Sequence, residues 1–173
     1  IAQKIISKAE GAVVDLKTIV PSEEAKRLAE QTGRDSRLCQ VYLNEAVEVL
    51  RVKGRMVITR HRLGFECSSS GVDRSNLASH SEEQVTLLPN DPDSSARYIR
   101  DDLLKVTGKK MAVIVNDSFG RPDRDGSIGM AIGIAGIHNL EMSEQKDLFG
   151  NDVKNRIALV DELASAASML MGQ

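Results

Sequence analysis

Apolar residues recur along this chain with two different spacings, and each spacing predicts one type of secondary structure. A spacing of three and four residues, which is typical of helices, is found over residues 21–33, 35–53, 94–107 and 156–171. The first of these segments begins with Pro, has acidic residues in its first turn and ends on Gly, all of which suit the backbone groups and dipole at helix ends. We expect Asp35 to cap the second helix and Gly108 to end the third.

Shorter apolar runs predict strands. Residues 56–60 and 65–69 flank a polar tetrapeptide that begins with His61, and they indicate a β-hairpin whose tip is solvated. A short strand is expected over residues 84–88. The unbroken apolar run over residues 111–115 is typical of a strand that is covered on both faces.

The order of these elements predicts the fold class. Helices and strands follow one another without the regular alternation of a doubly wound sheet, which favours an α+β fold, or an irregular α/β fold, with mixed and largely antiparallel sheets and packed helices. A chain of 173 residues is long enough for one domain. The chain begins with Ile1 and ends at Gln173 directly after an apolar helix, so we expect a single domain over residues 1–173 that is truncated at both ends.

Composition and charge argue against several classes of protein. The formal net charge is -2 and the basic residues are scattered, which argues against a nucleic-acid partner. No run approaches the roughly 20 apolar residues of a membrane span, and no signal peptide is evident, so we expect no membrane association and a cytoplasmic location. Two cysteines, Cys39 and Cys67, are too few for a disulfide scaffold and form no CxxC pair. They are expected to be buried or half-buried thiols.

The first group of residues that could perform chemistry lies over residues 116–127, where we expect the buried strand to emerge into a loop punctuated by glycines. Asp117 and Ser118 offer the hard oxygen atoms that Mg²⁺ and Mn²⁺ prefer. Arg121 and Arg124 could neutralise a phosphate or a carboxylate. The alternative is structural, with Asp117 capping a turn and the arginines solvated.

A second acidic loop and two lysines complete the candidate site. Asp73 and Asn76 offer oxygen ligands in a loop that Gly71 makes flexible. The alternative for this loop is an ordinary Asx-turn. Lys4 and Lys8 provide point charges suited to a nucleotide phosphate, although such lysines commonly face water. Two acidic loops in one small domain favour a shared cation.

Other familiar motifs are absent from the sequence. The three histidines show no ligand spacing and are expected on the surface or in loops; they are His61, His80 and His138. Neither a Walker A pattern nor a GxGxxG motif after a strand is found, and the glycines of GMAIGIAG are spaced GxxxGxxG. A bound nucleotide would therefore be held by a different kind of cradle.

Several stretches resemble a known family in their order and spacing. They are AQKIISKAEG, PSEEAKRLAEQTG, SGVDRSN, LLPNDPDSSARYIR, VIVNDSFGRP with GMAIGIAG, DLFGND and VDELASAASMLMGQ. Together they span nearly the whole chain, and their joint order makes chance agreement improbable. On these stretches the chain is similar to the coenzyme F420 gamma-glutamyl ligases.

The resemblance implies an activity and its partners. It implies a GTP-dependent ligase that adds L-glutamate to the lactyl carboxylate of the deazaflavin F420-0, and then a further glutamate through a gamma linkage, by way of an acyl phosphate. Mg²⁺ or Mn²⁺ would assist the reaction, with K⁺ as a candidate further cation. An intertwined homodimer of α/β character is implied as well.

The resemblance also implies roles for particular residues. The metal ligands fall on Asp73, Asp117 and Ser118, and the contacts to GTP fall on Gln3, Lys4, Lys8 and Asn76. No catalytic residue is assigned, but Arg121 and Arg124 are candidate charge stabilisers.

Two departures from the family pattern leave alternatives open. Asp123 stands where the family usually has an aromatic residue, and Asp125 where it has an uncharged or basic one. Loss of a stacking ring would weaken a contact to a flat substrate, so a related amide ligase with another acid acceptor is a second hypothesis. A third is a non-catalytic dimeric module, which the apolar final helix and the missing ends would suit.

Overall fold

The computed structural model describes residues 1–75, 77, 83–122 and 124–171 of the chain. The chain forms two compact units: Lys4–Pro89 is called the N-terminal unit, and Ile1–Gln3 together with Asn90–Gln173 the C-terminal unit. Both combine helices with small antiparallel sheets, which confirms the α+β fold class. No helix among the described residues is long and apolar enough to cross a membrane. That the whole chain is one ligase domain stays a prediction.

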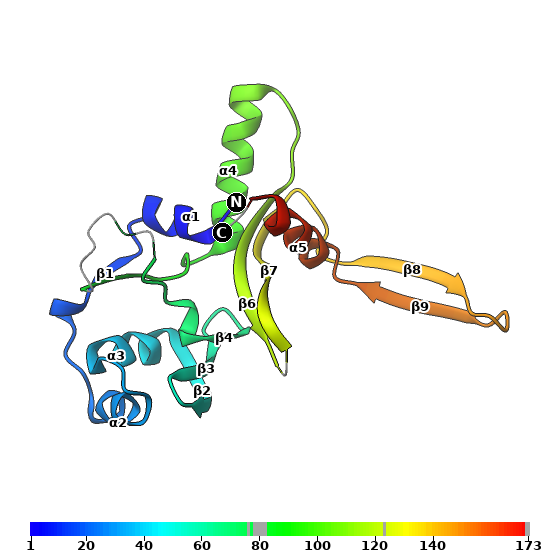
Figure 1. Cartoon of the computed structure of the whole chain (residues 1–173). Helices are drawn as coiled ribbons and strands as arrows, with labels where there is room; N and C mark the ends of the chain where they lie inside the picture. Colours follow the sequence, from blue (N-terminus) through cyan, green and yellow to red (C-terminus); the bar gives the residue numbers. More distant parts are fainter. Residues whose placement is uncertain (76, 78–82, 123, 172–173) are drawn as a thin grey trace. The chain divides into compact units, whose positions relative to one another are not determined.

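The N-terminal unit packs helices against two small sheets. Strands β2, β3 and β4 form one antiparallel sheet in that order, and β1 pairs with β5 in the other (Figure 1). A core of mostly aliphatic side chains includes Leu16, Leu28, Leu38, Val57 and Val85. The elements are α1 (Gln3–Ala9), whose first residue is assigned to the C-terminal unit, β1 (Val13–Asp15), η1 (Leu16–Thr18), α2 (Glu23–Thr32), α3 (Ser36–Glu45), β2 (Ala46–Lys53), β3 (Met56–His61), β4 (Glu66–Ser68), η2 (Ser69–Gly71) and β5 (Gln84–Thr86).

Local sequence signals set the ends of α2 and α3. The Ser22 hydroxyl accepts a hydrogen bond from the Ala25 amide at 3.2 Å, and Gly33 ends α2 in the left-handed conformation. The Asp35 carboxylate accepts from the Arg37 amide at 2.8 Å, which confirms its predicted role as the cap of α3. The predicted strands at residues 56–60, 65–69 and 84–88 are confirmed by β3, β4 and β5.

The predicted second helix is wrong beyond its midpoint. Residues 46–53 form strand β2, which pairs antiparallel with β3 from Ala46 opposite His61 to Lys53 opposite Met56. This segment contains three valines, whose β-branched side chains have few accessible rotamers and therefore favour a strand. Because β3 supplies the hydrogen-bond partners, tertiary pairing overrides the helical spacing of the apolar residues.

The C-terminal unit is built around one long antiparallel hairpin, β6–β7. Its elements are α4 (Pro92–Thr107), β6 (Val113–Arg121), β7 (Arg124–Ala135), β8 (Glu141–Lys146), β9 (Asp152–Ile157) and α5 (Leu159–Met171). The capping of α4 by Asp91 and its end at Gly108 agree with the predicted helix. The prediction of a loop after residue 115 is wrong, because β6 continues through Arg121 and pairs with β7 over its whole length.

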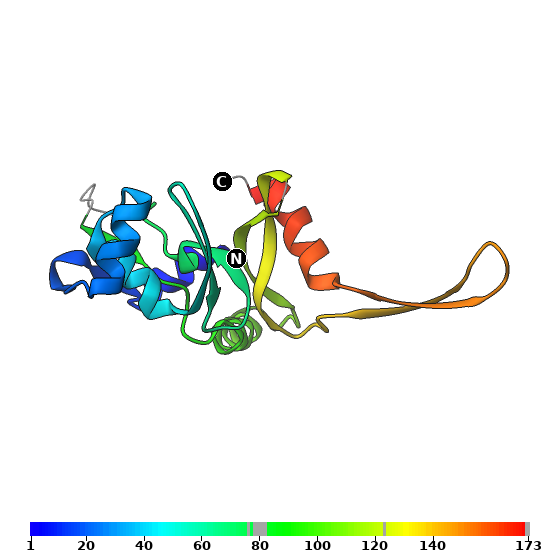
Figure 2. The ribbon, with the colours of Figure 1, turned by 90° about the horizontal axis from the view of Figure 1, so that it is seen from below.

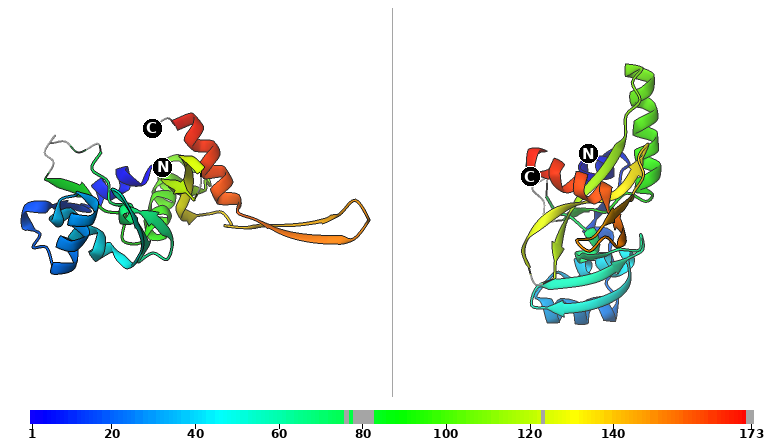
Figure 3. Two further views of the ribbon diagram at one scale, coloured as in Figure 1. Left: turned by 60° about the horizontal axis from the view of Figure 1, so that its bottom comes forward. Right: turned by 90° about the vertical axis from the view of Figure 1, so that its right-hand side faces the viewer.

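Two glycines of β7 let helices approach the hairpin on opposite faces (Figure 3). A Cβ atom at Gly129 would overlap Ser168 of α5 and lie 2.7 Å from the Ala164 carbonyl oxygen. A Cβ atom at Gly133 would overlap the backbone of Pro92, at the beginning of α4. The spacing of glycines in GMAIGIAG is therefore explained by helix packing in this unit.

Side chains from both helices also satisfy the outer edge of β7. Asp161 of α5 accepts a hydrogen bond from the Ala131 amide at 3.0 Å, and Asp93 of α4 accepts from the Ile134 amide at 2.7 Å. The Ser165 hydroxyl donates to the Gly129 carbonyl at 2.7 Å. These bonds cover backbone groups of a strand edge that would otherwise need water or another strand.

Strands β8 and β9 form a separate hairpin, called the arm, over Glu141–Ile157. The arm projects away from β6–β7 and pairs only with itself among the described strands (Figure 2). Its strands were not predicted, and Ile157, which was expected in the last helix, belongs to β9. At the tip, the side chains of Leu148 and Phe149 are 99% and 90% exposed.

The glycine contacts generate a stability prediction. Gly129→Ala should lower the free energy of unfolding by about 1–3 kcal/mol, because the added methyl group forces α5 away from the hairpin. The measurement is a urea unfolding curve. Gly120→Ala is the matched control, since a Cβ atom there meets nothing within 4 Å. Equal unfolding midpoints for the two variants would contradict the packing role of Gly129.

Candidate functional site

The Asp73 carboxylate is held by a local turn and by a lysine. Its Oδ1 accepts a hydrogen bond from the Ser75 amide at 2.7 Å, and its Oδ2 accepts from the Ser75 hydroxyl at 2.8 Å. Lys4 Nζ lies 3.0 Å from Oδ2 of Asp73 and 3.0 Å from the Ser75 hydroxyl. The backbone of Asp73 also pairs with Thr86. The Asx-turn is therefore present, and the lysine bonded to it is one that the sequence analysis had singled out.

An unusual backbone precedes this turn. Ser69, Ser70 and Gly71 all have positive φ angles, of 54°, 51° and 66°. The buried Ser70 hydroxyl donates to the Tyr42 carbonyl at 2.7 Å, which ties the segment to the core. A Cβ atom at Gly71 would lie 2.6 Å from Leu88 Cδ1. Gly71 therefore permits a tight, left-handed approach here, whereas the sequence suggested that it makes the loop flexible.

The charge state of Asp73 follows from these contacts. Burial raises the pKa of this carboxyl, but the hydrogen bonds from Ser75 and the ion pair with Lys4 outweigh it and hold the pKa below its usual value. The side chains of Lys4 and Asp73 are 33% and 28% exposed. Asp73 is thus an ionised, half-buried carboxylate at neutral pH.

The residues expected to contact GTP in the first segment lie on α1. Gln3 is buried, at 2% exposure, while Lys4 is half-buried and Lys8 is exposed. Because Lys4 and Lys8 are four residues apart, they share a face of the helix. Asn76, which was predicted to join them, lies outside the described residues.

The structure places Asp117 and Ser118 on strand β6 and not in a loop. Asp117 is half-buried and Ser118 is exposed. Consecutive residues of a strand project to opposite faces, so the two side chains point to different sides of β6–β7. Ser118 is paired with Gly129, on the face that α5 covers, and Asp117 is on the other face.

Arg121 and Arg124 lie at the end of the hairpin remote from the helices' first turns. Arg121 donates from Nη2 to the Asp125 carbonyl at 3.0 Å, and the Gly126 amide donates to the Asp125 carboxylate at 2.9 Å. Arg121 follows Asp117 by four strand residues, or roughly 13 Å. Arg121 could therefore contact a group bound at Asp117 only if its side chain were extended. Asp123 lies outside the described residues.

Of the residues predicted from sequence, Lys4 and Asp73 are brought into direct contact. No three His, Cys, Asp or Glu side chains gather as a metal cluster anywhere in the described ranges. Asp73 belongs to the N-terminal unit and Asp117 to the C-terminal unit. That they meet at one cation stays a prediction.

The prediction that all three histidines lie on the surface or in loops is wrong for His61. Its side chain is fully buried, its ring stacks on Phe65 with centroids 5.4 Å apart, and its Nδ1 accepts from the Leu63 amide at 3.0 Å. Its Nε2 lies 3.5 Å from a Glu45 carboxylate oxygen. His138 is exposed, as predicted, and His80 lies outside the described residues.

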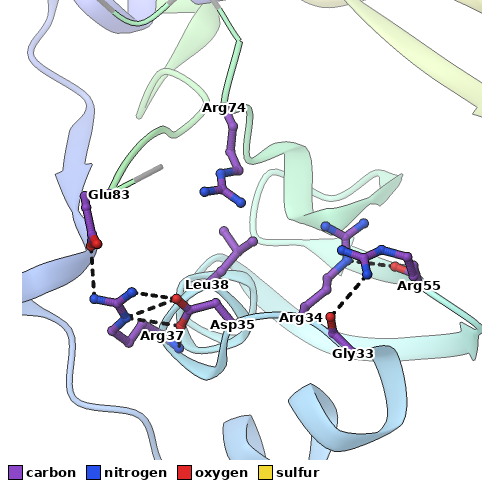
Figure 4. A pocket seen from close by; sticks show the side chains of 8 residues that line it. All are labelled: Gly33, Arg34, Asp35, Arg37, Leu38, Arg55, Arg74 and Glu83. Carbon is purple, nitrogen blue, oxygen red and sulfur yellow. Dashed lines mark hydrogen bonds and ion pairs between the residues drawn. The ribbon is translucent and has the colours of Figure 1, made fainter. Parts of the chain in front are cut away.

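A pocket that the sequence analysis missed lies entirely in the N-terminal unit. It has a volume of about 290 Å³ and is lined by four arginines and two acidic residues, among others: Arg34, Arg37, Arg55, Arg74, Asp35 and Glu83 (Figure 4). These residues come from four separate segments of the chain. Only Arg34, Asp35 and Arg37 are close enough in sequence to form a visible cluster, so no spacing could have identified the pocket.

Comparison with known proteins gives one consistent result. The family model described as F420-0:Gamma-glutamyl ligase matches residues 1–173. The coenzyme F420:L-glutamate ligase of Methanocaldococcus jannaschii is 46% identical over 175 residues, which cover 100% of this chain and 69% of that protein. The coenzyme F420:L-glutamate ligases of Methanopyrus kandleri and Methanothermobacter thermautotrophicus are 45% and 42% identical, and each match covers 100% of this chain and 68% of that protein.

The α+β fold and this set of relatives define the class of the protein as a ligase, and therefore an enzyme. More particularly, the chain belongs to the F420-0:gamma-glutamyl ligase family. The family resemblance that the sequence motifs indicated is thereby confirmed.

The lowered pKa of Asp73 generates a prediction about stability and pH. A carboxylate whose pKa is lowered on folding stabilises the protein above the unfolded pKa, and this contribution is lost as the pH falls through the folded pKa. Asp73→Asn should therefore lower the free energy of unfolding at neutral pH by on the order of 1–2 kcal/mol. The difference from the unmodified protein should narrow below about pH 4, near the unperturbed pKa of Asp.

Urea unfolding curves at several pH values would measure this difference. Glu30→Gln, at an exposed carboxylate of α2, serves as the control and should show little change at any pH. A deficit for Asp73→Asn that is the same in acid as at neutral pH would show that the charge of Asp73 is not its source.

Proposed function

We propose that this protein is a GTP- and divalent-metal-dependent ligase that adds L-glutamate to coenzyme F420-0, first through an amide and then through a gamma-glutamyl linkage. The match of the ligase family across residues 1–173 is the observation that carries the proposal. The names of the relatives support the deazaflavin and glutamate as substrates. The contact between Lys4 and Asp73 supports a site for charged groups in the N-terminal unit.

The proposed reaction has two steps. A carboxylate oxygen of the acceptor forms a bond to the terminal phosphorus of GTP, and the bond to GDP breaks. The glutamate nitrogen then bonds to the carbonyl carbon of the acyl phosphate, and inorganic phosphate leaves while the amine loses its proton. Both steps bring anions together, so positioning and charge neutralisation are the main tasks of the protein.

Lys4 and Lys8 are proposed to provide the positive charge that the nucleotide needs, with Gln3 and Asn76 as further contacts. The two lysines share a face of α1, so they can present two ammonium groups to one polyphosphate. Lys4 is at present bonded to Asp73. In the proposed complex this lysine would divide its hydrogen bonds between that carboxylate and a phosphate oxygen.

The donor set fits a hard cation. Mg²⁺ is commonly held by one or two carboxylates together with substrate phosphates and water, so it needs no cage made entirely of protein. Asp73 is ionised at neutral pH, as a ligand must be. Asp117 would supply the second carboxylate. Because the Ser118 side chain points to the other face of β6, Ser118 would offer its backbone carbonyl oxygen to the same cation. When bound, Mg²⁺ or Mn²⁺ would neutralise charge on the phosphate being transferred.

A related amide ligase with another acid acceptor is the second candidate, and Asp125 is the residue that favours it. This aspartate is exposed at the beginning of β7, and its backbone carbonyl engages the guanidinium group of Arg121. An anionic acceptor that approached this end of β7 would meet the negative charge of the Asp125 carboxylate. Binding of GTP and metal without binding of F420-0 would favour this second candidate.

The ligase proposal predicts the effect of removing one carboxylate. Asp117→Asn should lower kcat for metal-dependent ligation of L-glutamate to F420-0 by about 100-fold or more, because a neutral amide is a much poorer ligand for a hard cation. The assay is the formation of glutamylated deazaflavin by the enzyme as it is produced from its gene. Asp101→Asn, at an exposed aspartate of α4, is the control and should keep full activity. Full activity of Asp117→Asn would remove the proposed role.

We propose further that the protein is a homodimer located in the cytoplasm. An isolated two-stranded hairpin is only marginally stable in water, which supports the packing of the arm against a second copy of the chain. Exposed apolar side chains at its tip and along α5 support the same conclusion; they include Leu148, Phe149, Leu163, Met169 and Leu170. The free thiols of Cys39 and Cys67 are typical of a reducing compartment.

The proposed dimer leads to a prediction about the arm. A double variant with Leu148→Asp and Phe149→Asp should shift the protein from dimer to monomer, because the charges cannot be buried at an apolar contact. Light scattering after gel filtration would measure the mass. Val20→Asp, at an equally exposed apolar residue of the N-terminal unit, is the control and should leave the mass unchanged. A dimer that persists in the double variant would show that the tip is not part of the contact.

A further inference from the structure

The arginine pocket of the N-terminal unit brings together charges from distant parts of the chain (Figure 4). Arg34 follows the glycine that ends α2, Arg37 lies in the first turn of α3, Arg55 lies in the turn between β2 and β3, and Arg74 directly follows Asp73. With Asp35 and Glu83, the lining carries a formal charge of +2. The pocket is thus suited to an anion.

Both acidic residues of the lining are paired with Arg37. Arg37 lies 2.6 Å from Asp35 Oδ2 and 3.0 Å from Glu83 Oε2, so one guanidinium group serves two carboxylates. The hydrogen bond to Asp35 raises the pKa of Arg37, and the same bond lowers the pKa of Asp35. Arg37 and the two acids together carry a formal charge of -1, and the other three arginines carry +3, which gives the net charge of +2.

Arg34 and Arg55 are bonded mainly to backbone. Arg34 donates from Nε to the Arg55 carbonyl at 2.8 Å and from Nη1 to the Tyr42 hydroxyl at 3.2 Å, and Arg55 donates from Nη1 to the Gly33 carbonyl at 3.2 Å. Neither arginine is within ion-pair distance of a carboxylate in the part of the chain that the structure describes. These bonds orient the guanidinium groups without neutralising their charge, and each group has five N–H donors to offer.

The size of the pocket limits what it can hold. Pockets for drug-sized ligands have volumes of roughly 300–1,000 Å³, and this one, at about 290 Å³, lies at the lower end. It suits a small metabolite and not a nucleotide or a deazaflavin. Arginine forks bind carboxylates and phosphates equally well by geometry, so the other lining groups must decide between these ligands.

The acceptor groups of the lining favour an amino acid over phosphate. Glu83 contacts Arg37 through Oε2, and a carboxylate at this place can accept a hydrogen bond from an ammonium group but repels a phosphate dianion. We propose that this pocket binds a small dicarboxylic amino acid, whose carboxylates pair with Arg34, Arg55 and Arg74 and whose ammonium group faces Glu83. That the ligand is L-glutamate rests on the proposed function, whereas the pocket's preference for a dicarboxylic amino acid does not.

The position of Arg74 links this pocket to the candidate site. Arg74 and Asp73 are consecutive, so their Cα atoms are about 3.8 Å apart. In Figure 4 the Arg74 side chain reaches toward Leu38. An amino acid held by Arg74 would therefore be delivered beside the loop that is proposed to hold the cation.

Isothermal titration calorimetry without nucleotide, metal or deazaflavin tests the proposal. The titrants are L-glutamate, glutarate, which has both carboxylates but no ammonium group, and inorganic phosphate. L-Glutamate should bind, and glutarate and phosphate should bind more weakly. Arg55→Gln should weaken L-glutamate binding by about tenfold or more, because a charged hydrogen bond is lost. Arg27→Gln, at an exposed arginine of α2 outside the pocket, is the matched control and should bind normally.

Two more variants separate binding from folding. Arg34→Lys keeps the charge but loses the planar fork, so it should weaken binding while the thermal unfolding midpoint stays close to that of the unmodified protein. Glu83→Gln should reduce the preference for L-glutamate over glutarate. Phosphate binding more tightly than L-glutamate, no L-glutamate binding at all, or equal L-glutamate binding by Arg55→Gln and Arg27→Gln would each overturn the proposal.

The test also separates this proposal from the proposed function. If L-glutamate binds with the predicted dependence on Arg55 but the enzyme forms no glutamylated deazaflavin, the pocket is confirmed and the ligase proposal fails. If ligation proceeds while Arg55→Gln leaves the KM for glutamate unchanged, the ligase proposal stands and the pocket assignment is wrong.

Discussion

A half-buried carboxylate must replace its lost hydration, and in this protein Asp73 does so with a serine and a lysine. That requirement shapes the surrounding chain. The left-handed run before the turn brings the backbone close to Leu88, and pairing with Thr86 keeps Asp73 in register with β5. The same contacts that make Asp73 stable in the fold also keep it ionised, which is the state that a metal ligand needs.

The C-terminal unit meets a different requirement, because a two-stranded hairpin by itself leaves both faces and both outer edges uncovered. Helices α4 and α5 cover the two faces of β6–β7, and aspartates in their first turns bond to the edge amides of β7. Such close packing is available only where a strand residue lacks a side chain. The hairpin that presents Asp117 is therefore held by contacts on both sides, which would suit the metal-binding role that we propose for this residue.

Charge is distributed differently in the two parts of the N-terminal unit that we connect to function. At Asp73, one lysine balances one carboxylate and little net charge remains. In the arginine pocket, Arg37 pairs with both acids and offsets one of their two charges, and the lining as a whole keeps a formal charge of +2. A site for a cation with its phosphates and a site for a small acid can thus lie close together, because each balances the charge of its own ligand.

Features that depend on a few consecutive residues were readable from the sequence, whereas pairing between distant segments was not. The beginnings of α2, α3 and α4 and the turn at Asp73 follow from side chains that bond to backbone two or three residues away. The secondary structure of residues 46–53 and 118–135 depends on hydrogen bonds from other strands. The arginine pocket depends on the meeting of four separate segments. Short-range geometry depends on the local residue types. Strand pairing uses backbone hydrogen bonds that almost any residue type can form, so it cannot be assigned until the partner strand is known.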